Sequence, residues 1–239
     1  MSHLRMREKM LRMNKKLVIS IVFACFFAGF FFFLLKDRNE HSLNSQPVTQ
    51  ENHPTIDLVE DCIVFIGDER LEKCDWRSLM QCDKIYNLSQ SQNTIKDEYN
   101  RLDYLFGEVH PSQVVVMLGL RDLMNKIPVN QVYADFVQCI ETMQSRYPQT
   151  EIIILPILPV DYNMPVVYNS LKEKDIEAFN LLVKLYALEK GLSYVSMAND
   201  LKGTGGNLRR EYSQGDGLSF SDAAYYVMKD RLSAYLRLN

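Results

Sequence analysis

The chain has 239 residues, of which 47% are hydrophobic and 24% are charged, a composition that fits one globular domain and excludes disordered and collagenous proteins. Residues 1–40 hold eight Lys and Arg against three Asp and Glu, so the net charge of −3 divides into +5 there and −8 over residues 41–239. Because phosphate binding needs a basic surface, the acidic main body argues against a nucleic-acid partner.

Residues 17–35 (LVISIVFACFFAGFFFFLL) form the first predicted element, a run of nineteen residues without a charge. As a helix this run would be about 28 Å long, enough to cross the hydrocarbon core of a bilayer. The basic tail at residues 1–16 precedes it, so the positive-inside rule places the N-terminus in the cytoplasm and the C-terminal part outside. A cleaved signal peptide is the alternative, but its apolar run is usually shorter and ends in a small-x-small site. We therefore predict a single-pass membrane anchor, followed by a polar, flexible linker at residues 36–58.

The remaining residues, 59–239, alternate short apolar runs with amphipathic segments. Apolar, mostly β-branched runs predict strands at residues 62–66, 85–88, 114–118, 152–157 and 194–196. Helical spacing, illustrated by the stripe of Leu181, Leu185 and Leu188, predicts helices at residues 69–80, 94–106, 129–146, 171–190 and 221–236. Apolar strands separated by helices predict an α/β fold, a three-layer, doubly wound, parallel five-stranded sheet of flavodoxin-like type.

Four cysteines lie in this predicted domain: Cys62, Cys74, Cys82 and Cys139. An exported domain can oxidise its thiols, and Cys62 and Cys82 stand near the starts of two neighbouring predicted strands. A Cys62–Cys82 disulfide is therefore one hypothesis, and buried free thiols are the other.

Ligands of doubly wound folds bind outside the carboxyl ends of the strands, and the loops there carry four motifs. These read Ile-Gly-Asp-Glu (66–69), Asn-Leu-Ser-Gln-Ser (87–91), Leu-Gly-Leu-Arg-Asp-Leu (118–123) and Asp-Gly-Leu-Ser (216–219). In order and spacing they resemble the SGNH/GDSL hydrolase family over roughly residues 60–236.

The resemblance implies a role for each motif. In that family the first motif supplies a nucleophilic serine, the second an oxyanion glycine, the third an oxyanion asparagine, and the last a base histidine with its orienting aspartate. Here the four roles fall, in turn, on Glu69, Ser89, Arg121 and Ser219, none of which is the family residue. The positions that do match are Gly67, Asp68, Gly119, Asp122 and the orienting acid Asp216.

The substitutions remove the chemistry of an ester hydrolase. Such an enzyme needs a hydroxyl nucleophile and an imidazole that takes its proton, but Glu69 is an anion and Ser219 cannot accept a proton at neutral pH. No histidine follows residue 110. The backbone N–H of Ser89 could still donate to an oxyanion. We expect no cofactor, and a metal site is disfavoured because Arg121 would repel a cation.

Structural roles can account for the same residues. Asp68 is a good N-cap, and Ser219 with Asp222 fits a helix cap, with Ser221 as a competing cap. Arg121 could lie between Glu69, Asp122 and Asp216 and neutralise them. The alternative, a glycosidase-type acid/base pair of Glu69 and Asp216, is disfavoured because Arg121 would lower both pKa values when one must be raised.

The loop at residues 156–170 carries three prolines with Tyr162 and Tyr168. Tyrosines on such a loop offer contacts to a carbohydrate or protein partner, although packed, half-buried tyrosines are equally compatible. We therefore expect a non-hydrolytic binding or accessory protein, near an enzyme that handles acyl groups of envelope polysaccharide, as the resemblance implies. The alternatives are an active O-acyl esterase or acyltransferase on cell-envelope carbohydrate, using an unorthodox catalytic set, and an inert spacer domain.

Overall fold

The structure is a computed structural model that describes residues 59–107 and 109–238. The tail predicted at residues 1–16, the anchor predicted at 17–35 and the linker predicted at 36–58 all lie outside these described residues. None of the helices in the described part is long and apolar enough to cross a membrane.

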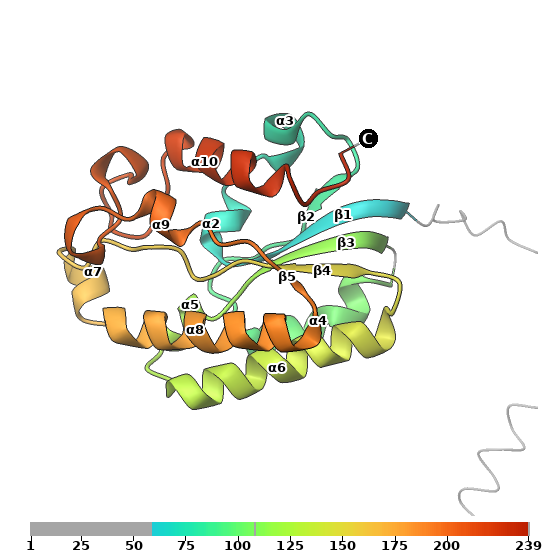
Figure 1. The fold of residues 1–239 in the computed structure, drawn as a ribbon, viewed down its shortest axis with the longest axis horizontal. Coiled ribbons are helices and arrows are strands. Elements are labelled where there is room, and N and C mark those ends of the chain that lie inside the picture. Colours follow the sequence, from blue (N-terminus) through green and yellow to red (C-terminus); the bar gives the residue numbers. More distant parts are fainter. Residues whose placement is uncertain (1–58, 108, 239) are drawn as a thin grey trace, which may run out of the picture. The chain divides into compact units, whose positions relative to one another are not determined.

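Five parallel strands form one sheet in the order β2-β1-β3-β4-β5 (Figure 1). In chain order they are β1 (Val59–Gly67), β2 (Ile85–Asn87), β3 (Val109–Met117), β4 (Glu151–Ile154) and β5 (Ser193–Tyr194). This is the flavodoxin-like order, so the predicted fold class is confirmed.

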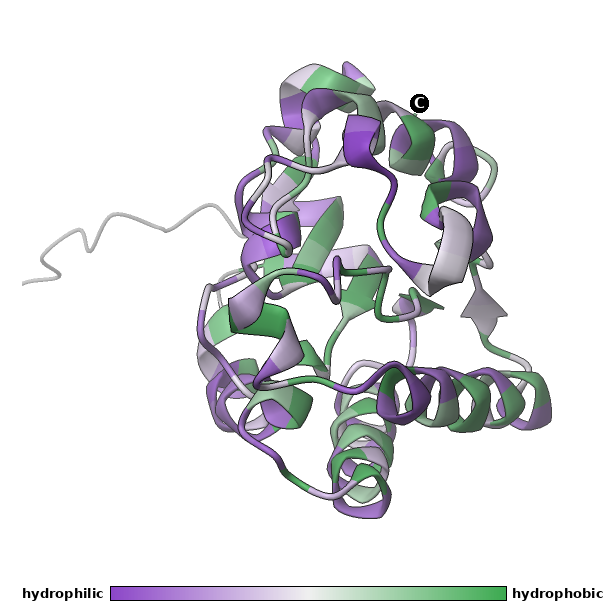
Figure 2. Cartoon of the chain, turned by 90° about the vertical axis from the view of Figure 1, so that its left-hand side faces the viewer, coloured by the Kyte–Doolittle hydropathy of each residue, from purple (hydrophilic) through white to green (hydrophobic). Residues whose placement is uncertain are grey.

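Side chains of the strands alternate between two separate cores, one on each face of the sheet. In β1, for example, Val64 and Ile66 are fully buried in one core, while Phe65 is fully buried in the other. Figure 2 shows these hydrophobic strand segments in the middle of the domain, between two layers of helices. A sheet buried on both faces explains why its strands read as continuous apolar runs.

Two helical layers cover the sheet. One face packs against α4 (Ile95–Leu105), α6 (Val129–Arg146) and α8 (Glu173–Lys190). The other packs against the shorter helices α2 (Glu69–Glu72), α3 (Trp76–Met80), α9 (Ala198–Leu201) and α10 (Asp222–Leu232) (Figure 1). Two further one-turn helices, α5 (Leu120–Met124) and α7 (Pro165–Tyr168), and two 3-10 turns, Thr204–Gly206 and Arg210–Tyr212, lie in the connections.

Several predicted boundaries are wrong. The helix predicted at residues 69–80 is two helices, because Asp75 caps α3 by accepting a hydrogen bond from the backbone N–H of Ser78 at 3.1 Å. The strand predicted at residues 152–157 ends at Ile154, two residues before Pro156, which has no N–H for a sheet ladder. The short helices α5, α7 and α9 were not predicted, since one helical turn is too short to show a hydrophobic period.

The leucine stripe used to predict α8 lies on the wrong face of that helix. Leu181, Leu185 and Leu188 are 57%, 53% and 67% exposed. The face that packs on the sheet contains instead Ile176, Phe179, Val183, Tyr186 and Ala187. The helix is present, but the sequence contained two apolar stripes and the aromatic one is buried.

The hypothesis of a Cys62–Cys82 disulfide is wrong. All four cysteines of the described residues are buried free thiols. Cys62 packs in the core beside α4, α6 and α8, whereas Cys82 packs in the core on the opposite face of the sheet. Residues on opposite faces point away from each other and cannot be bridged.

Candidate functional site

The first motif follows β1 directly and begins α2. A Cβ at Gly67 would lie 2.7 Å from the carbonyl oxygen of Met117 on the neighbouring strand, so only glycine fits the end of this strand. Asp68 then caps α2, with Oδ1 accepting a hydrogen bond from the backbone N–H of Arg70 at 2.9 Å. The predicted N-cap role of Asp68 is confirmed.

Asp68 also forms a buried ion pair that the sequence analysis missed. Arg70 is completely buried, and its Nη2 lies 2.8 Å from Oδ2 of Asp68. Nη1 of Arg70 donates to the carbonyl oxygen of Leu158 at 2.9 Å, and the guanidinium lies 5.4 Å from the centre of the Phe220 ring. Asp68 is therefore held in a structural network that joins α2 to the loop after β4.

Glu69, at the nucleophile position, forms an ion pair with Arg121. Nη2 of Arg121 lies 3.3 Å from Oε1 of Glu69, and the two side chains are only 15% and 10% exposed. The other oxygen of Glu69 and Nε of Arg121 have no hydrogen-bond partner among the described residues. The positions that the resemblance assigns to the nucleophile and to an oxyanion donor are thus occupied by two side chains that form an ion pair with each other.

Arg121 does not lie among three carboxylates, so that part of the prediction is wrong. Asp122 is 1% exposed and its carboxylate accepts from the backbone N–H of Ile95, at 3.1 Å and 3.3 Å, at the start of α4. Burial raises the pKa of Asp122 to about 6, although these hydrogen bonds oppose the shift. Asp216 forms no ion pair with Arg121 within the described residues. The carboxylates of Glu69, Asp122 and Asp216 therefore have separate hydrogen-bond partners.

Gly119 positions the third motif. It has a φ of +107° and precedes α5, and a Cβ there would lie 2.8 Å from the ring of Phe179. Both the left-handed backbone and the close approach of α8 require glycine at this position. Glycine at position 119, which matches the family, is thus explained by the backbone conformation and by the packing of α8.

Ser219, at the base position, accepts a hydrogen bond from Lys73. The distance from Nζ of Lys73 to Oγ of Ser219 is 2.7 Å, and Ser219 is 2% exposed. Its backbone N–H donates to Oδ1 of Asp216 at 2.7 Å. Ser219 is not a helix cap as predicted, because α10 begins after Ser221, whose hydroxyl donates instead to the carbonyl of Glu211.

The orienting acid Asp216 remains available as an anion. Partial burial acts to raise its pKa, but hydrogen bonds from Ser219 and from the N–H of Leu218, with the charge of Lys73, outweigh it and lower the pKa. Lys73 was missed by the sequence analysis. It stands four residues after Glu69, and this spacing, which places two side chains on one face of a helical turn, was the signal that could have identified it.

Ser89, at the second oxyanion position, is also engaged. Its backbone N–H donates to Oδ1 of Asn87 at 3.2 Å, which is contrary to the suggestion that this N–H is free for an oxyanion. Its hydroxyl is buried with no partner among the described residues. The donors left without a partner at these two positions are therefore the hydroxyl of Ser89 and Nε of Arg121, and the backbone N–H of Ser89 is not one of them.

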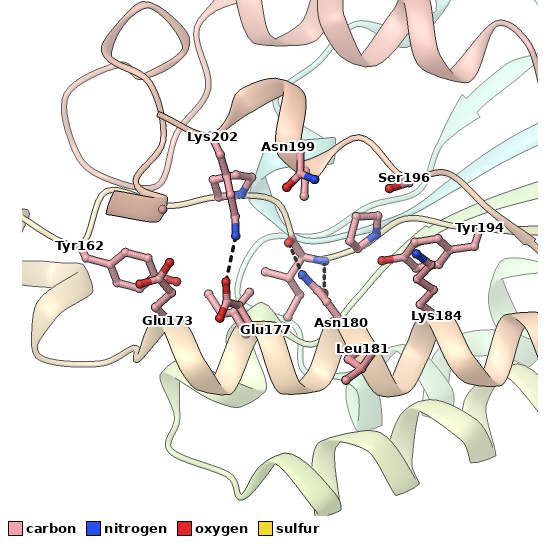
Figure 3. A pocket seen from close by; sticks show the side chains of 16 residues that line it. Tyr162, Glu173, Glu177, Asn180, Leu181, Lys184, Tyr194, Ser196, Asn199 and Lys202 are labelled. Carbon is pink, nitrogen blue, oxygen red and sulfur yellow. Dashed lines mark hydrogen bonds and ion pairs between the residues drawn. The ribbon is translucent and has the colours of Figure 1, made fainter. Parts of the chain in front are cut away.

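The two tyrosines of the loop after β4 lie apart. Tyr168 is 76% exposed on α7, whereas Tyr162 is half-buried and lines a cavity of about 240 Å³ between α8 and the segment that follows β5 (Figure 3). Burial raises the pKa of Tyr162, and the nearby Glu173 and Glu177 add to the shift. The structure thus separates the two tyrosines that the sequence analysis had grouped.

Within the described part of the chain, no group of three His, Cys, Asp or Glu side chains is arranged to hold a metal ion. The pair that could act in acid/base catalysis, Glu69 and Asp216, is divided between two cationic partners, Arg121 and Lys73. The pKa of Asp216 is lowered, whereas a glycosidase-type acid requires a raised pKa.

The fold and the order of these loops agree with a match to known sequences. A sequence profile of the GDSL-like lipase/acylhydrolase family matches residues 72–227. The chain belongs to this family. The match begins three residues after Glu69, so it does not include the nucleophile position. A search of curated proteins gave no match.

Solved structures show the same GDSL-like fold. A protein from Streptococcus pneumonia provisionally described as a platelet activating factor is 27% identical, with a TM-score of 0.65 over 77% of this chain and 86% of that one. A GDSL-like lipase from Bacteroides thetaiotaomicron is 17% identical, with a TM-score of 0.65 over 83% and 94% of the two chains. An acetyl xylan esterase is 16% identical, with a TM-score of 0.61 over 74% and 100%.

Proposed function

We propose that this GDSL-like protein does not hydrolyse esters and acts as a membrane-anchored binding or accessory protein outside the cytoplasm. The observation that carries the proposal is the Glu69–Arg121 pair, in which two oppositely charged side chains occupy the positions of the nucleophile and of an oxyanion donor. An ester carbonyl placed there would meet a carboxylate already bound to a cation. Attack by that carboxylate would give an anhydride, and His110, the one histidine among the described residues, lies at the amino end of β3, at the opposite end of the strand from this site.

The base position supports the same proposal. Ser219 is buried, and its hydroxyl accepts a hydrogen bond from Nζ of Lys73. A serine hydroxyl in the place of an imidazole cannot take a proton from a nucleophile at neutral pH. The cluster of Lys73, Ser219 and Asp216 therefore has the character of a structural clamp between α2 and the loop before α10.

An assay of the full chain in detergent tests the proposal. We expect no turnover of p-nitrophenyl acetate or of acetylated glycans above the level of the Asp216→Asn variant. Turnover by the unmodified chain that the Asp216→Asn variant lacks would overturn the proposal, because a lost triad aspartate typically removes most activity from such enzymes.

A second candidate, an active O-acyl esterase or acyltransferase acting on cell-envelope carbohydrate, rests on the 2.7 Å contact between Lys73 and Ser219. Serine–lysine pairs act as nucleophile and base in some hydrolases. In such an enzyme, Ser219→Ala and Lys73→Met would each abolish turnover, whereas Glu69→Gln would not. The same assay therefore separates the two candidates.

Anchoring by residues 17–35 is the second part of the proposal. Its support is the uncharged run of nineteen residues behind a basic tail. Fusion of alkaline phosphatase after residue 58 is expected to give an active reporter, since that enzyme needs the oxidising exterior, and fusion after residue 16 an inactive one. The reverse pattern would overturn the proposed topology.

A further inference from the structure

The cavity next to Tyr162 lies outside the former catalytic positions. It is formed by α8, by the loop that leaves β4 and by the segment that joins β5 to α9 (Figure 3). This is the carboxyl end of β4 and β5, the edge of a doubly wound sheet at which ligands bind. Its volume of about 240 Å³ lies below the roughly 300–1,000 Å³ of pockets for drug-sized ligands and suits a smaller molecule.

Polar side chains without protein partners line this cavity. Tyr194, Ser196 and Asn199 come from the segment around the end of β5, and Lys184 comes from α8. None of these four side chains, nor the hydroxyl of Tyr162, forms a hydrogen bond to another described residue. Figure 3 shows the rings of Tyr162 and Tyr194 entering from opposite ends of the cavity. A few convergent polar groups in a concave site are typical of small-molecule binding.

The floor of the cavity is held rigidly. The amide of Asn180 on α8 clamps the backbone of Ile157, accepting from its N–H at 2.8 Å and donating to its carbonyl oxygen at 2.8 Å. Nearby, Nζ of Lys202 forms an ion pair with Glu177 at 3.1 Å, and this contact joins α8 to the end of α9 (Figure 3). The site is thus formed in advance by the fold.

The absence of a side chain at Gly206 allows the carboxylate of Glu173 to lie at the cavity. Gly206 has a φ of +78°, and a Cβ there would fall 1.8 Å from Oε1 of Glu173. The carboxylate of Glu173, which forms no ion pair within the described residues, therefore lies directly against this glycine. Glu173 adds an acceptor to a set of groups that otherwise consists mainly of donors and hydroxyls.

The charges at the cavity select against ionic ligands. Glu177 is paired with Lys202, and Glu173 and Lys184 carry opposite charges, so the cavity has no net charge to attract an anion or a cation. Hydroxyls, an amide, an ammonium and a carboxylate can all bond to a ligand whose own groups both donate and accept. A neutral molecule with several hydroxyls on one ring meets these conditions.

We propose that this cavity binds a single sugar unit, free or at the end of a glycan, through Tyr162, Glu173, Lys184, Tyr194, Ser196 and Asn199. The inference deepens the proposed function, since it gives the binding role a site separate from the former catalytic positions. It places the partner of this protein among neutral carbohydrates.

Saturation-transfer NMR on the full chain, in a detergent without a sugar headgroup, tests the proposal. The probes are the methyl glycosides of glucose, galactose, mannose and N-acetylglucosamine, the matching free sugars and disaccharides, and inorganic phosphate. We expect transfer to at least one glycoside and none to phosphate. A preference for disaccharides over the free sugar would identify the end of a glycan as the source, and equal transfer would identify the free sugar.

Two variants locate the binding. Tyr162→Phe and Asn199→Ala each remove one neutral polar group from the cavity, and each is expected to raise the Kd of the bound glycoside about threefold to tenfold. The matched controls are Tyr104→Phe and Asn169→Ala, which change exposed residues outside this cavity and are expected to leave the Kd unchanged. Thermal unfolding of all four variants confirms that the fold is retained.

Three results would overturn the inference: no transfer to any sugar at millimolar concentration, binding of phosphate in place of sugars, or sugar binding that Tyr162→Phe and Asn199→Ala leave unchanged. None of them would restore ester hydrolysis, so the non-hydrolytic proposal would stand. Conversely, an active esterase that binds sugar in this cavity would overturn only the proposed function.

Discussion

Lys73 and Ser219 are 146 residues apart in the chain and meet at 2.7 Å, at the place where the resemblance to the SGNH/GDSL family puts a catalytic histidine. The contact ties the end of α2 to the loop before α10. It also brings a cation within reach of Asp216, whose pKa is lowered. The residue at this position, Ser219, accepts a hydrogen bond from a lysine.

Restoring the family residues at two positions alone is not expected to restore activity. In Glu69→Ser/Ser219→His, Arg121 would lose its carboxylate and remain beside the new nucleophile. The triple variant Glu69→Ser/Arg121→Asn/Ser219→His supplies the nucleophile, base and amide donor together. We expect it to exceed the double variant in p-nitrophenyl acetate hydrolysis by about two orders of magnitude, the usual scale for one oxyanion-hole donor.

The control is the triple variant with Asp216→Asn added. We expect it to lose the increase in p-nitrophenyl acetate hydrolysis, because the new histidine would no longer be oriented. Equal activity of the double and triple variants would show that Arg121 does not block the site.

The Glu69–Arg121 pair is expected to show strong coupling in a double-mutant cycle. Each single replacement by Ala leaves one mostly covered charge without its partner, and we expect each to lower the free energy of unfolding by about 1–3 kcal/mol. Replacing both removes the unpaired charge, so the double variant should lose less than the sum of the two. Urea unfolding measures all three, and additive losses would mean that the pair contributes nothing as a pair.

Glu98 is expected to make the protein less stable as the pH rises from about 4.5 to 7. This side chain is fully buried in α4, and burial raises its pKa from 4.5 to about 7, although the hydrogen bond from Asn93 and the charge of Arg101 oppose the shift. Between these values the folded state binds more protons than the unfolded one, so stability falls with pH.

The measurement is the urea midpoint against pH for the unmodified chain and for Glu98→Gln. The neutral amide has no such titration, so the slope between pH 4.5 and 7 should flatten. The exposed Glu189→Gln is the matched control on α8 and should leave the slope unchanged. A slope that survives in Glu98→Gln would assign the titration to Asp122, whose pKa is raised to about 6.

Asp216 is expected to act with the opposite sign. Its pKa is lowered in the folded state, so its contribution to stability is complete above the unfolded pKa near 3.8 and is lost as the pH falls through the lower folded value. Asp216→Asn should therefore destabilise the protein at neutral pH and have no effect in strong acid. An equal loss of stability at neutral pH and in strong acid would show that Asp216 acts through the geometry of its hydrogen bonds and not through its charge.

The sequence predicted the parallel five-stranded sheet and the long helices because these depend on patterns that repeat over many residues. It also placed Asp68, Glu69, Ser89, Arg121 and Ser219 on the correct loops. The contacts of these side chains could not be read in the same way. The pairing of Glu69 with Arg121 by opposite charge was correct. Asp122, however, accepts a hydrogen bond from a backbone N–H at the start of α4, because the first N–H groups of a helix have no partner within the helix and can bind a carboxylate as a guanidinium does.

Lys73 and Arg70 show a second reason for the missed contacts. The family motifs point only to residues at the motif positions, whereas Arg70 and Lys73, which contact Asp68 and Ser219, lie one and four positions after Glu69. Arg70 is fully buried, a rare state for arginine, and nothing in the local pattern separates it from the exposed basic residues nearby. Long-range packing alone decides which of them is enclosed.

The four thiols of the folded domain are expected to react only after unfolding. Burial raises the pKa of Cys62 to about 11 and those of Cys74 and Cys139 to about 12, and Cys82 is 7% exposed. Since the thiolate is the reactive form, iodoacetamide at pH 8 should leave all four peptides unmodified in the native protein and label all four in urea, with or without prior reduction. Peptide mapping by mass spectrometry reads each site separately. Labelling in urea that requires prior reduction would reveal a disulfide and contradict the placement of Cys62 and Cys82 on opposite faces of the sheet.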